Sequence, residues 1–191
     1  MSLSHTTLPP SSSSKSTVPR VCVVGPELTG KTALARLLAD HFNTVYVTEY
    51  ARIYAIEKTA VQGSAWWPEE FIHIARTQTR LEAEAETMAG DVMICDTDAF
   101  SIWVWHRYYA AQPVEALRTF CDARPADLYL LTSEDDALTE DTPVNAVPRD
   151  VVLDAYRREL EATGRRYLEV TGTLEERLSK SITATEELLA S

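Results

Sequence analysis

A short segment near the start of the chain constrains the fold more than any other part of the sequence. Residues 25–32 read Gly-Pro-Glu-Leu-Thr-Gly-Lys-Thr and match the pattern G-x-x-x-x-G-K-[ST], which occurs by chance in roughly one in a hundred chains of this length. The segment follows a short apolar run at residues 21–24, and it precedes a run of helix formers in which Leu34, Leu37 and Leu38 share one face. A strand, a glycine loop and a helix in this order are typical of a P-loop.

The residue types in this loop suit the binding of phosphates. Backbone N–H groups at the start of a helix attract negative charge, and Gly25 and Gly30 would allow the tight turn and the close backbone approach. Lys31 would reach the β- and γ-phosphates of ATP or GTP, and the Thr32 hydroxyl would coordinate Mg²⁺. The other nucleotide-binding residues that we predict in the loop are Glu27, Leu28 and Thr29. A glycine turn without a ligand is the alternative.

Strand and helix signals alternate along the rest of the chain. Short apolar runs predict further strands at residues 45–47, 92–95, 128–131 and 167–170. Helical segments are expected between them, including one from Pro68 to near Gly90, one from Arg149 to Gly164, and a last one after a capping box of Thr173 and Glu176. The alternation predicts a three-layer α/β fold, in which a five-stranded, mainly parallel sheet has helices on both faces.

The start of the chain differs in composition from the rest. Residues 1–19 are rich in Ser, Thr and Pro and bury too little apolar surface to offset the entropy lost on ordering, so we predict a disordered tail there and one domain at residues 20–191. No apolar run is long enough to span a bilayer or to form a signal peptide, and we expect a cytoplasmic protein. The wide spacing of Cys22, Cys95 and Cys121 predicts buried thiols rather than disulfides or a zinc site.

The charge of the chain limits its partners. A formal net charge of -11 disfavours a polyanion, because a basic groove would have to form on a repulsive surface. A single nucleotide is different, since a few backbone N–H groups, one lysine and Mg²⁺ can hold its phosphates locally. We therefore expect a small, nucleoside-like partner, and neither nucleic acid nor a membrane.

Charged residues follow two predicted strands at the edge of the sheet where the glycine loop should lie. Asp96 comes directly after the strand at 92–95, where a carboxylate associated with Mg²⁺ is expected, although an Asp there can also cap a helix. Asp98 could hold a sugar hydroxyl, act as a base or cap the next helix. Glu49 could deprotonate an attacking hydroxyl while Arg52 neutralises charge on the transferring group. A surface ion pair between them is the alternative.

Two further groups of residues could contribute to a site. The polar, acidic stretch at 133–148 is typical of a surface loop or a mobile flap, and Arg149, Arg157 and Arg158 after it could close over the γ-phosphate and exclude water. A solvated helix face is the alternative for these arginines. Tryptophans could stack on a flat heterocycle or pack in the core; they are Trp66, Trp67, Trp103 and Trp105.

Several short segments occur in a characteristic order along the chain. They are residues 25–32, 48–52 (Thr-Glu-Tyr-Ala-Arg), 74–78 (Ile-Ala-Arg-Thr-Gln) and 95–98 (Cys-Asp-Thr-Asp), followed by Trp105, Tyr108 and Tyr109. The Glu-Tyr-Ala-Arg and Cys-Asp-Thr-Asp sequences are more specific than the glycine loop. Together these segments resemble a known family, the nicotinamide-riboside kinase domain of the bacterial NAD-biosynthesis regulator NadR, and the similarity covers roughly residues 19–189.

This resemblance implies a P-loop kinase-like fold and a specific reaction. The γ-phosphoryl group of ATP would pass to the 5′-hydroxyl of nicotinamide riboside, which gives nicotinamide mononucleotide, and the site residues would include Glu49, Arg52, Asp96 and Asp98. The sequence departs from the family at residues 143–149, which keep a proline and an arginine but lack the proline-tryptophan pair and the Asp-Gly-x-Arg segment. Nothing in these residues resembles the family's DNA-binding or adenylyltransferase domains.

Other classes of function compete with a kinase. A P-loop ATPase or nucleotide-binding regulatory module would act on a protein partner, and a binding module with an altered flap would hold ATP without transferring phosphate. A GTPase switch is disfavoured because the chain lacks an N-K-x-D segment. We predict an ATP-dependent small-molecule kinase whose catalytic residues are Lys31, Glu49, Arg52, Asp98 and Arg149.

Overall fold

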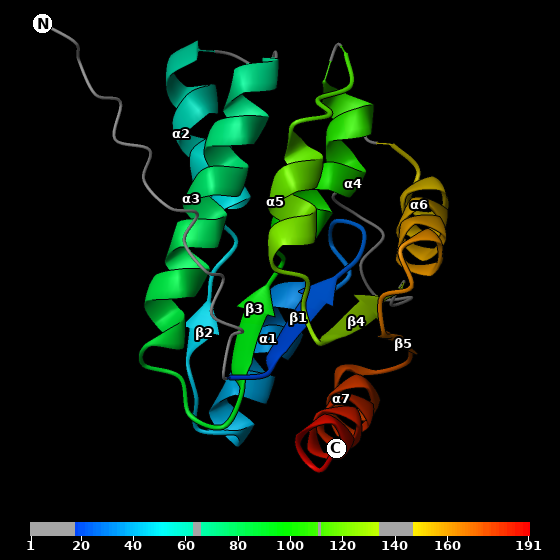
Figure 1. Cartoon of the computed structure of the whole chain (residues 1–191). Helices are drawn as coiled ribbons and strands as arrows, with labels where there is room; N and C mark the ends of the chain where they lie inside the picture. The colour runs from blue at the N-terminus through cyan, green and yellow to red at the C-terminus, as the bar shows by residue number, and fades with distance from the viewer. Residues whose placement is uncertain (1–17, 63–65, 111, 134–146) are drawn as a thin grey trace, which may run out of the picture.

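The computed structural model describes residues 18–62, 66–110, 112–133 and 147–191. Its centre is a five-stranded sheet in the order β2-β3-β1-β4-β5, in which every neighbouring pair is parallel (Figure 1). The strands are β1 (Arg20–Val24), β2 (Tyr46–Val47), β3 (Met93–Asp96), β4 (Leu128–Thr132) and β5 (Tyr167–Val170). The predicted parallel sheet is confirmed, and the strand before the glycine loop occupies its middle.

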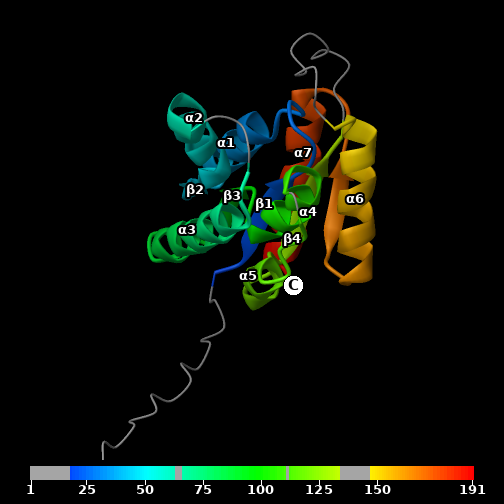
Figure 2. The same cartoon turned by 90° about the horizontal axis from the view of Figure 1, so that it is seen from above.

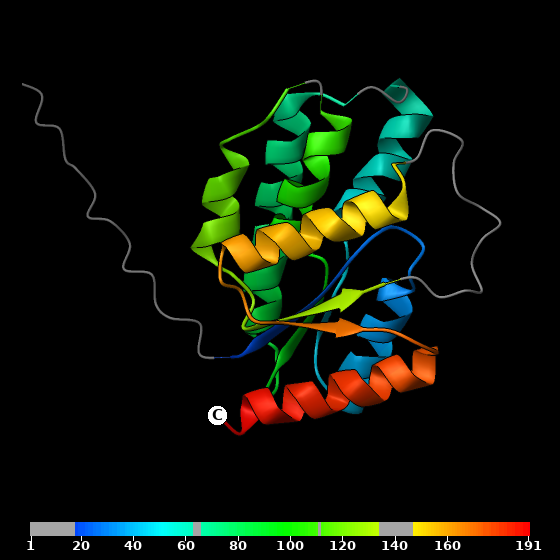
Figure 3. The same ribbon diagram turned by 90° about the vertical axis from the view of Figure 1, so that its right-hand side faces the viewer.

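Helices cover both faces of this sheet. One face carries α1 (Lys31–His41) and α7 (Leu174–Leu189) (Figure 3). On the other side, α4 lies between α3 and α6 when the molecule is seen from above (Figure 2). The helices of that side are α2 (Tyr50–Gln62), α3 (Pro68–Glu86), α4 (Ala99–Tyr109), α5 (Leu117–Ala123) and α6 (Arg149–Ala162).

The central strand contributes to two separate apolar cores. Val21 and Val23 pack with α1 and α7, whereas Cys22 and Val24 face the core formed with α3, α4 and α6. All five residues of β1 are buried, which is why its sequence is almost continuously apolar instead of alternating. Both cores therefore hold the strand that ends at the glycine loop.

The helix that begins at Pro68 is shorter than predicted. It ends at Glu86, because the N–H groups of Thr87 and Met88 bond to carbonyls three residues earlier and so tighten the last turn. Gly90 does not adopt the left-handed conformation that we expected to stop this helix. By contrast, Gly164 has a φ of 63° two residues after the end of α6, at the position where this helix was predicted to stop.

The start of α7 has the predicted capping box. The Thr173 hydroxyl accepts from the Glu176 N–H, and the Glu176 carboxylate accepts from the Thr173 N–H at 2.9 Å. These bonds satisfy donors that would otherwise be unpaired at the helix start. The first turn of α7 is therefore well defined.

Some predictions fall on residues that the structure does not describe. These are the tail at residues 1–19, apart from Val18 and Pro19, and residues 134–146 of the expected flap. The three cysteines are buried free thiols, as predicted. Within the described ranges, no helix is both long and apolar enough to cross a membrane.

Candidate active site

Gly25 and Gly30 occupy backbone conformations that would be strained for other residues. Gly25 has a φ of 140°, and a Cβ atom there would lie 2.5 Å from the carbonyl oxygen of Thr132. Gly30 has a φ of 77°, in the left-handed region, directly before α1 begins at Lys31. The tight turn predicted for these glycines is present, and at Gly25 the backbone passes close to the end of β4.

Side chains inside the loop hold it against the end of β4. The hydroxyls of Thr29 and Thr132 lie 2.6 Å apart, and Thr29 Oγ1 also donates to the Pro26 carbonyl at 2.9 Å. Lys31 Nζ donates to the same carbonyl at 2.6 Å. Burial lowers the pKa of Lys31, while the nearby Glu49 carboxylate acts in the opposite direction. The lysine is thus folded back over its own loop.

Asp96 lies beside the start of α1, as the pairing of β3 with β1 requires. In the sheet register Asp96 is the partner of Val23, and Thr32 Oγ1 donates to Asp96 Oδ2 at 2.6 Å. The Tyr46 hydroxyl donates to the same oxygen at 3.0 Å. The other oxygen, Oδ1, is buried and has no hydrogen-bond partner among the described residues.

This arrangement fits a magnesium ion. Mg²⁺ prefers oxygen ligands and is usually bound by one or two protein groups together with phosphates and water. Thr32 Oγ1 and the unpartnered Asp96 Oδ1 are oxygens of this kind. Among the described residues no cluster of three or more His, Cys, Asp or Glu could enclose a metal by itself, so such an ion would need the phosphates as additional ligands.

Glu49 and Arg52 form an ion pair at the end of β2. Arg52 Nε lies 3.5 Å from Glu49 Oε2, and the Arg52 side chain is 56% exposed whereas that of Glu49 is 17% exposed. Burial raises the pKa of Glu49 above its usual value, although Lys31 opposes this shift. Both residues line the same cavity as the glycine loop, which a plain surface pair would not do.

A cavity of about 380 Å³ connects the glycine loop to a wall of aromatic rings. In that wall the rings of Trp66 and Trp105 lie 5.7 Å apart, nearly perpendicular, and Tyr109 packs 5.5 Å from Trp105. The loop residues that line the cavity are Gly25, Pro26, Glu27, Leu28 and Lys31. Most of the remaining lining comes from Glu49, Arg52, Thr97, Ser101, Arg149, Val152 and Tyr156. Thr97 and Tyr156 were not predicted.

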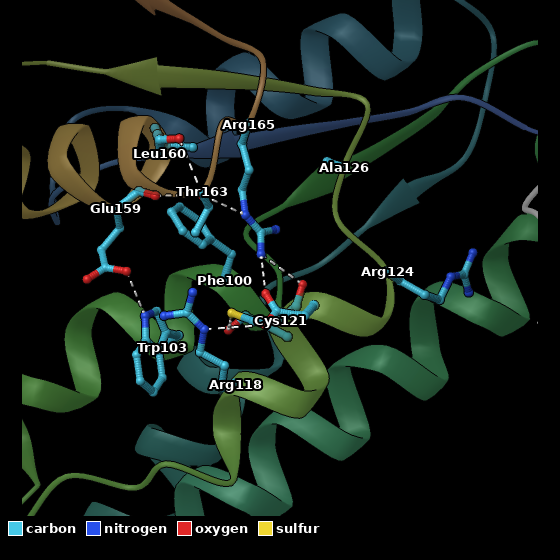
Figure 4. Close-up of polar contacts among 12 residues, drawn as sticks. Phe100, Trp103, Arg118, Cys121, Arg124, Ala126, Glu159, Leu160, Thr163 and Arg165 are labelled. Atoms are coloured by element: carbon cyan, nitrogen blue, oxygen red, sulfur yellow. Dashed lines mark hydrogen bonds and ion pairs between the residues drawn. The ribbon is translucent and has the colours of Figure 1, made fainter.

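The four tryptophans differ in their surroundings. Trp66 and Trp105 line the cavity, whereas Trp67 is 63% exposed. Trp103 is buried in the core, where its indole N–H donates to Glu159 at 3.0 Å (Figure 4). Only the first two could therefore stack on a ligand in the cavity.

Of the three predicted flap arginines, only Arg149 lines the cavity. The Arg157 guanidinium instead donates to Glu169 on β5, at 2.8 Å from Nε. Arg158 Nε donates to the Asp154 carbonyl on its own helix at 3.2 Å. The predicted closure over the γ-phosphate is thus compatible with the position of Arg149 and does not apply to Arg157 or Arg158.

Asp98 takes the capping role that was one of its three predicted alternatives. Its Oδ1 accepts from the N–H groups of Phe100 and Ser101 at the start of α4, and its Oδ2 accepts from the Tyr129 hydroxyl at 2.9 Å. The Arg20 guanidinium lies 3.9 Å from Oδ2. Asp98 is 2% exposed and does not line the cavity, so the substrate and catalytic roles expected for it do not fit its position.

Thr97 is one of the cavity residues that sequence reasoning missed. It has a φ of 64°, an uncommon conformation for a β-branched residue, and it borders the cavity between the strand end and the cap of α4. Its N–H donates to the Val23 carbonyl at 3.0 Å. The signals for it in the sequence were its place between two aspartates and its inclusion in the Cys-Asp-Thr-Asp segment.

Comparison with known proteins identifies the family and the fold. A family model described as an AAA domain matches residues 20–177. A crystal structure of NadR protein in complex with NR has a TM-score of 0.77 at 21% identity, over 91% of this chain and 52% of the NadR chain. Thymidylate kinase from Ehrlichia chaffeensis has a TM-score of 0.65 at 13% identity, over 88% and 98% of the two chains. Deoxyadenosine kinase from M. mycoides has a TM-score of 0.62 at 8% identity, over 88% and 99%.

The similarity covers different fractions of the compared proteins. The chain spans about half the length of the NadR chain and nearly the whole length of the other two kinases. A search of curated proteins gives no match. At these identities the similar structures establish the fold, which is the P-loop kinase-like fold predicted from the sequence, and the matched family model establishes that the chain belongs to the AAA domain family.

Proposed function

We propose that this chain is an ATP-dependent kinase that phosphorylates a small nucleoside, with the 5′-hydroxyl of nicotinamide riboside as the first candidate acceptor. The observation that carries the proposal is the single cavity shared by the glycine loop, the Glu49–Arg52 pair and an aromatic wall. A phosphate donor and a hydroxyl acceptor could meet there, because groups suited to each lie on the same hollow. The likeness to structures of NadR and of two other kinases supports this reading.

The site residues suggest how the transfer would proceed. The acceptor oxygen forms a bond to the γ-phosphorus, the bond from that phosphorus to the β,γ-bridging oxygen breaks, and ADP leaves. Glu49 takes the hydroxyl proton, and its raised pKa makes it a better base than an exposed carboxylate. Lys31 and Arg52 balance the negative charge on the transferring group. Mg²⁺ on Thr32 and Asp96 would neutralise phosphate charge when it is bound.

The acceptor end of the cavity suits a cationic heterocycle. The faces and edges of Trp66, Trp105 and Tyr109 can contact a flat ring, and aromatic faces attract cations. Carboxylates of Glu27 and Glu49 border the same space. The pyridinium ring of nicotinamide riboside carries a positive charge, so it matches this lining better than a neutral base does.

The test is acceptor-dependent release of ADP. The chain is incubated with ATP and Mg²⁺, alone and with nicotinamide riboside, cytidine, uridine, thymidine or deoxyadenosine. We expect ADP to form fastest with nicotinamide riboside, together with a phosphorylated product detected by mass spectrometry. ADP release at the same rate without acceptor would instead identify an ATPase, and ATP binding without any turnover would identify a binding module.

The phosphate donor and the cysteines both favour a cytoplasmic location for the proposed enzyme. ATP is abundant in the cytoplasm, and the three buried free thiols suit a reducing compartment. We propose that the enzyme acts there.

A further inference from the structure

An arginine on the last helix reaches the underside of the glycine loop. Arg177 lies in the first turn of α7. This helix covers the face of the sheet opposite α3, α4 and α6 (Figure 3). Its side chain is buried, and Nη1 donates to the carbonyl oxygen of Thr29 at 2.5 Å, between residues 148 positions apart in the chain. The reaction outlined above makes no use of this residue.

The bond to Thr29 determines the direction of a neighbouring N–H group. The peptide bond between Thr29 and Gly30 is trans, and in a planar trans peptide the carbonyl and the N–H point in opposite directions. Because the Thr29 carbonyl is held toward α7, the Gly30 N–H is directed away from α7. In a glycine loop, N–H groups of this kind hold the phosphates.

The guanidinium also limits the shape of the loop at Gly30. A Cβ atom on Gly30 would lie 3.3 Å from Arg177 Nη1 and 3.4 Å from Nη2. The planar group therefore lies against the Cα of Gly30, which itself has a left-handed φ of 77°. The backbone N–H of Arg177 donates to the Thr173 carbonyl at 2.9 Å, so the capped first turn of α7 fixes the position from which the Arg177 side chain extends.

We propose that Arg177 is a positioning residue for the phosphate-binding loop. It orients the Thr29–Gly30 peptide, and its positive charge lies directly behind the N–H groups that receive the β-phosphate. Its loss should weaken the binding of nucleotides that carry a β-phosphate and leave AMP unaffected. The inference rests on the proposed nucleotide site at this loop.

The experiment compares nucleotide affinities by calorimetry. ATP, ADP and AMP are titrated into the wild-type chain, Arg177→Met and the control Lys180→Met, which removes an exposed cation from the same helix. We expect ATP and ADP to bind about five- to tenfold more weakly to Arg177→Met, with AMP changed less than twofold. Lys180→Met should bind all three like the wild type, and thermal melting shows whether each variant is folded.

The outcomes separate this inference from the proposed function. If the wild type does not bind ATP, the nucleotide site itself is wrong. If the wild type binds ATP and Arg177→Met has the same ratio of ATP to AMP affinity, whatever its melting temperature, Arg177 does not position the loop. Should Arg177→Met fail to fold, Arg177→Lys replaces it, because the shorter ammonium keeps the charge but cannot lie flat against Gly30. A ratio lowered at least twofold is then expected, and an unchanged ratio overturns the proposal.

Discussion

The hydroxyl of Thr32 donates to one oxygen of Asp96 at 2.6 Å, while the other oxygen of that carboxylate is buried without a partner. An unpaired buried carboxylate oxygen is costly, and a bound cation would compensate it. The two residues come from α1 and β3, which the parallel sheet brings together. The pair is therefore the most direct structural reason to expect a metal next to the glycine loop.

Replacing Asp96 with Asn should weaken the binding of Mg²⁺ without unfolding the chain. The amide oxygen can still accept from Thr32, but the negative charge that attracts the metal is gone. We expect the Mg²⁺ concentration for half-maximal activity to rise about a hundredfold. Asp91→Asn, at the exposed approach to the same strand, is the matched control. An Asp96→Asn variant with wild-type Mg²⁺ dependence would exclude Asp96 from the metal site.

Replacing Lys31 with Ala should abolish turnover and leave the fold intact. The buried ammonium is the loop's only side-chain cation, and its removal relieves the cost of burial that lowers its pKa. We expect kcat to fall about a thousandfold while the melting temperature stays within a few degrees of the wild type. Steady-state rates and thermal melting measure the two effects. Activity close to the wild type would rule out the site at this loop.

Protonation of Glu49 should cause the fall in kcat on the acidic side of the pH profile. A general base must be deprotonated, and burial raises the pKa of Glu49, so the rate should rise with pH through a pKa above that of an exposed glutamate. Glu49→Gln should lower kcat about a hundredfold or more and remove this limb. The measurement is kcat against pH for both proteins. An acidic limb that persists in Glu49→Gln would belong to another group.

The same substitution should affect stability in the opposite direction. Because the pKa of Glu49 is higher in the folded than in the unfolded chain, the folded state binds the proton more tightly. The protonated carboxyl therefore stabilises the fold at low pH, and this contribution is lost as pH rises through the raised pKa. Glu49→Gln should then be more stable than the wild type at neutral pH and similar to it in acid. Denaturation at both pH values checks the sign.

Gly25→Ala should be far more disruptive than Gly164→Ala. Both glycines have positive φ, but a Cβ at Gly25 would lie 2.5 Å from the Thr132 carbonyl oxygen, whereas at Gly164 nothing lies within 4 Å. We expect a loss in the free energy of unfolding of at least about 3 kcal/mol for Gly25→Ala and about 1–2 kcal/mol for Gly164→Ala. Urea denaturation measures both. Equal losses would mean that the approach to Thr132 does not constrain the loop.

Sequence reasoning was most successful where local chemistry decides the structure. The glycine loop, the strands of the sheet and the Thr173–Glu176 cap follow from residue type and spacing, and each is present. It failed where the structure depends on hydrogen bonds that residue types do not specify. The end of α3 before Gly90 depends on the bonds of Thr87 and Met88, which spacing does not reveal.

The same limit applies to the site. Asp96 and Asp98 are the same residue type at or just after the end of the same strand, yet the positive φ of Thr97 between them separates their surroundings. Asp96 contacts Thr32, whereas Asp98 is used by the N–H groups of α4 and by Tyr129. The order of residue types in the sequence does not reveal this change in the direction of the backbone at Thr97. The contact of Arg177 with Thr29 could not be predicted from the sequence either, because it depends on how α7 packs.

The division of the molecule by its sheet has a consequence for how such an enzyme can diversify. The loop and Arg177 are held by α1 and α7 on one face, while the aromatic wall on the other consists of Trp66, just before α3, and of Trp105 and Tyr109 on α4. Substitutions in Trp66, Trp105 or Tyr109 would therefore alter the acceptor without disturbing the residues that hold phosphate. Directed evolution toward another nucleoside should accumulate its changes almost entirely on that second face.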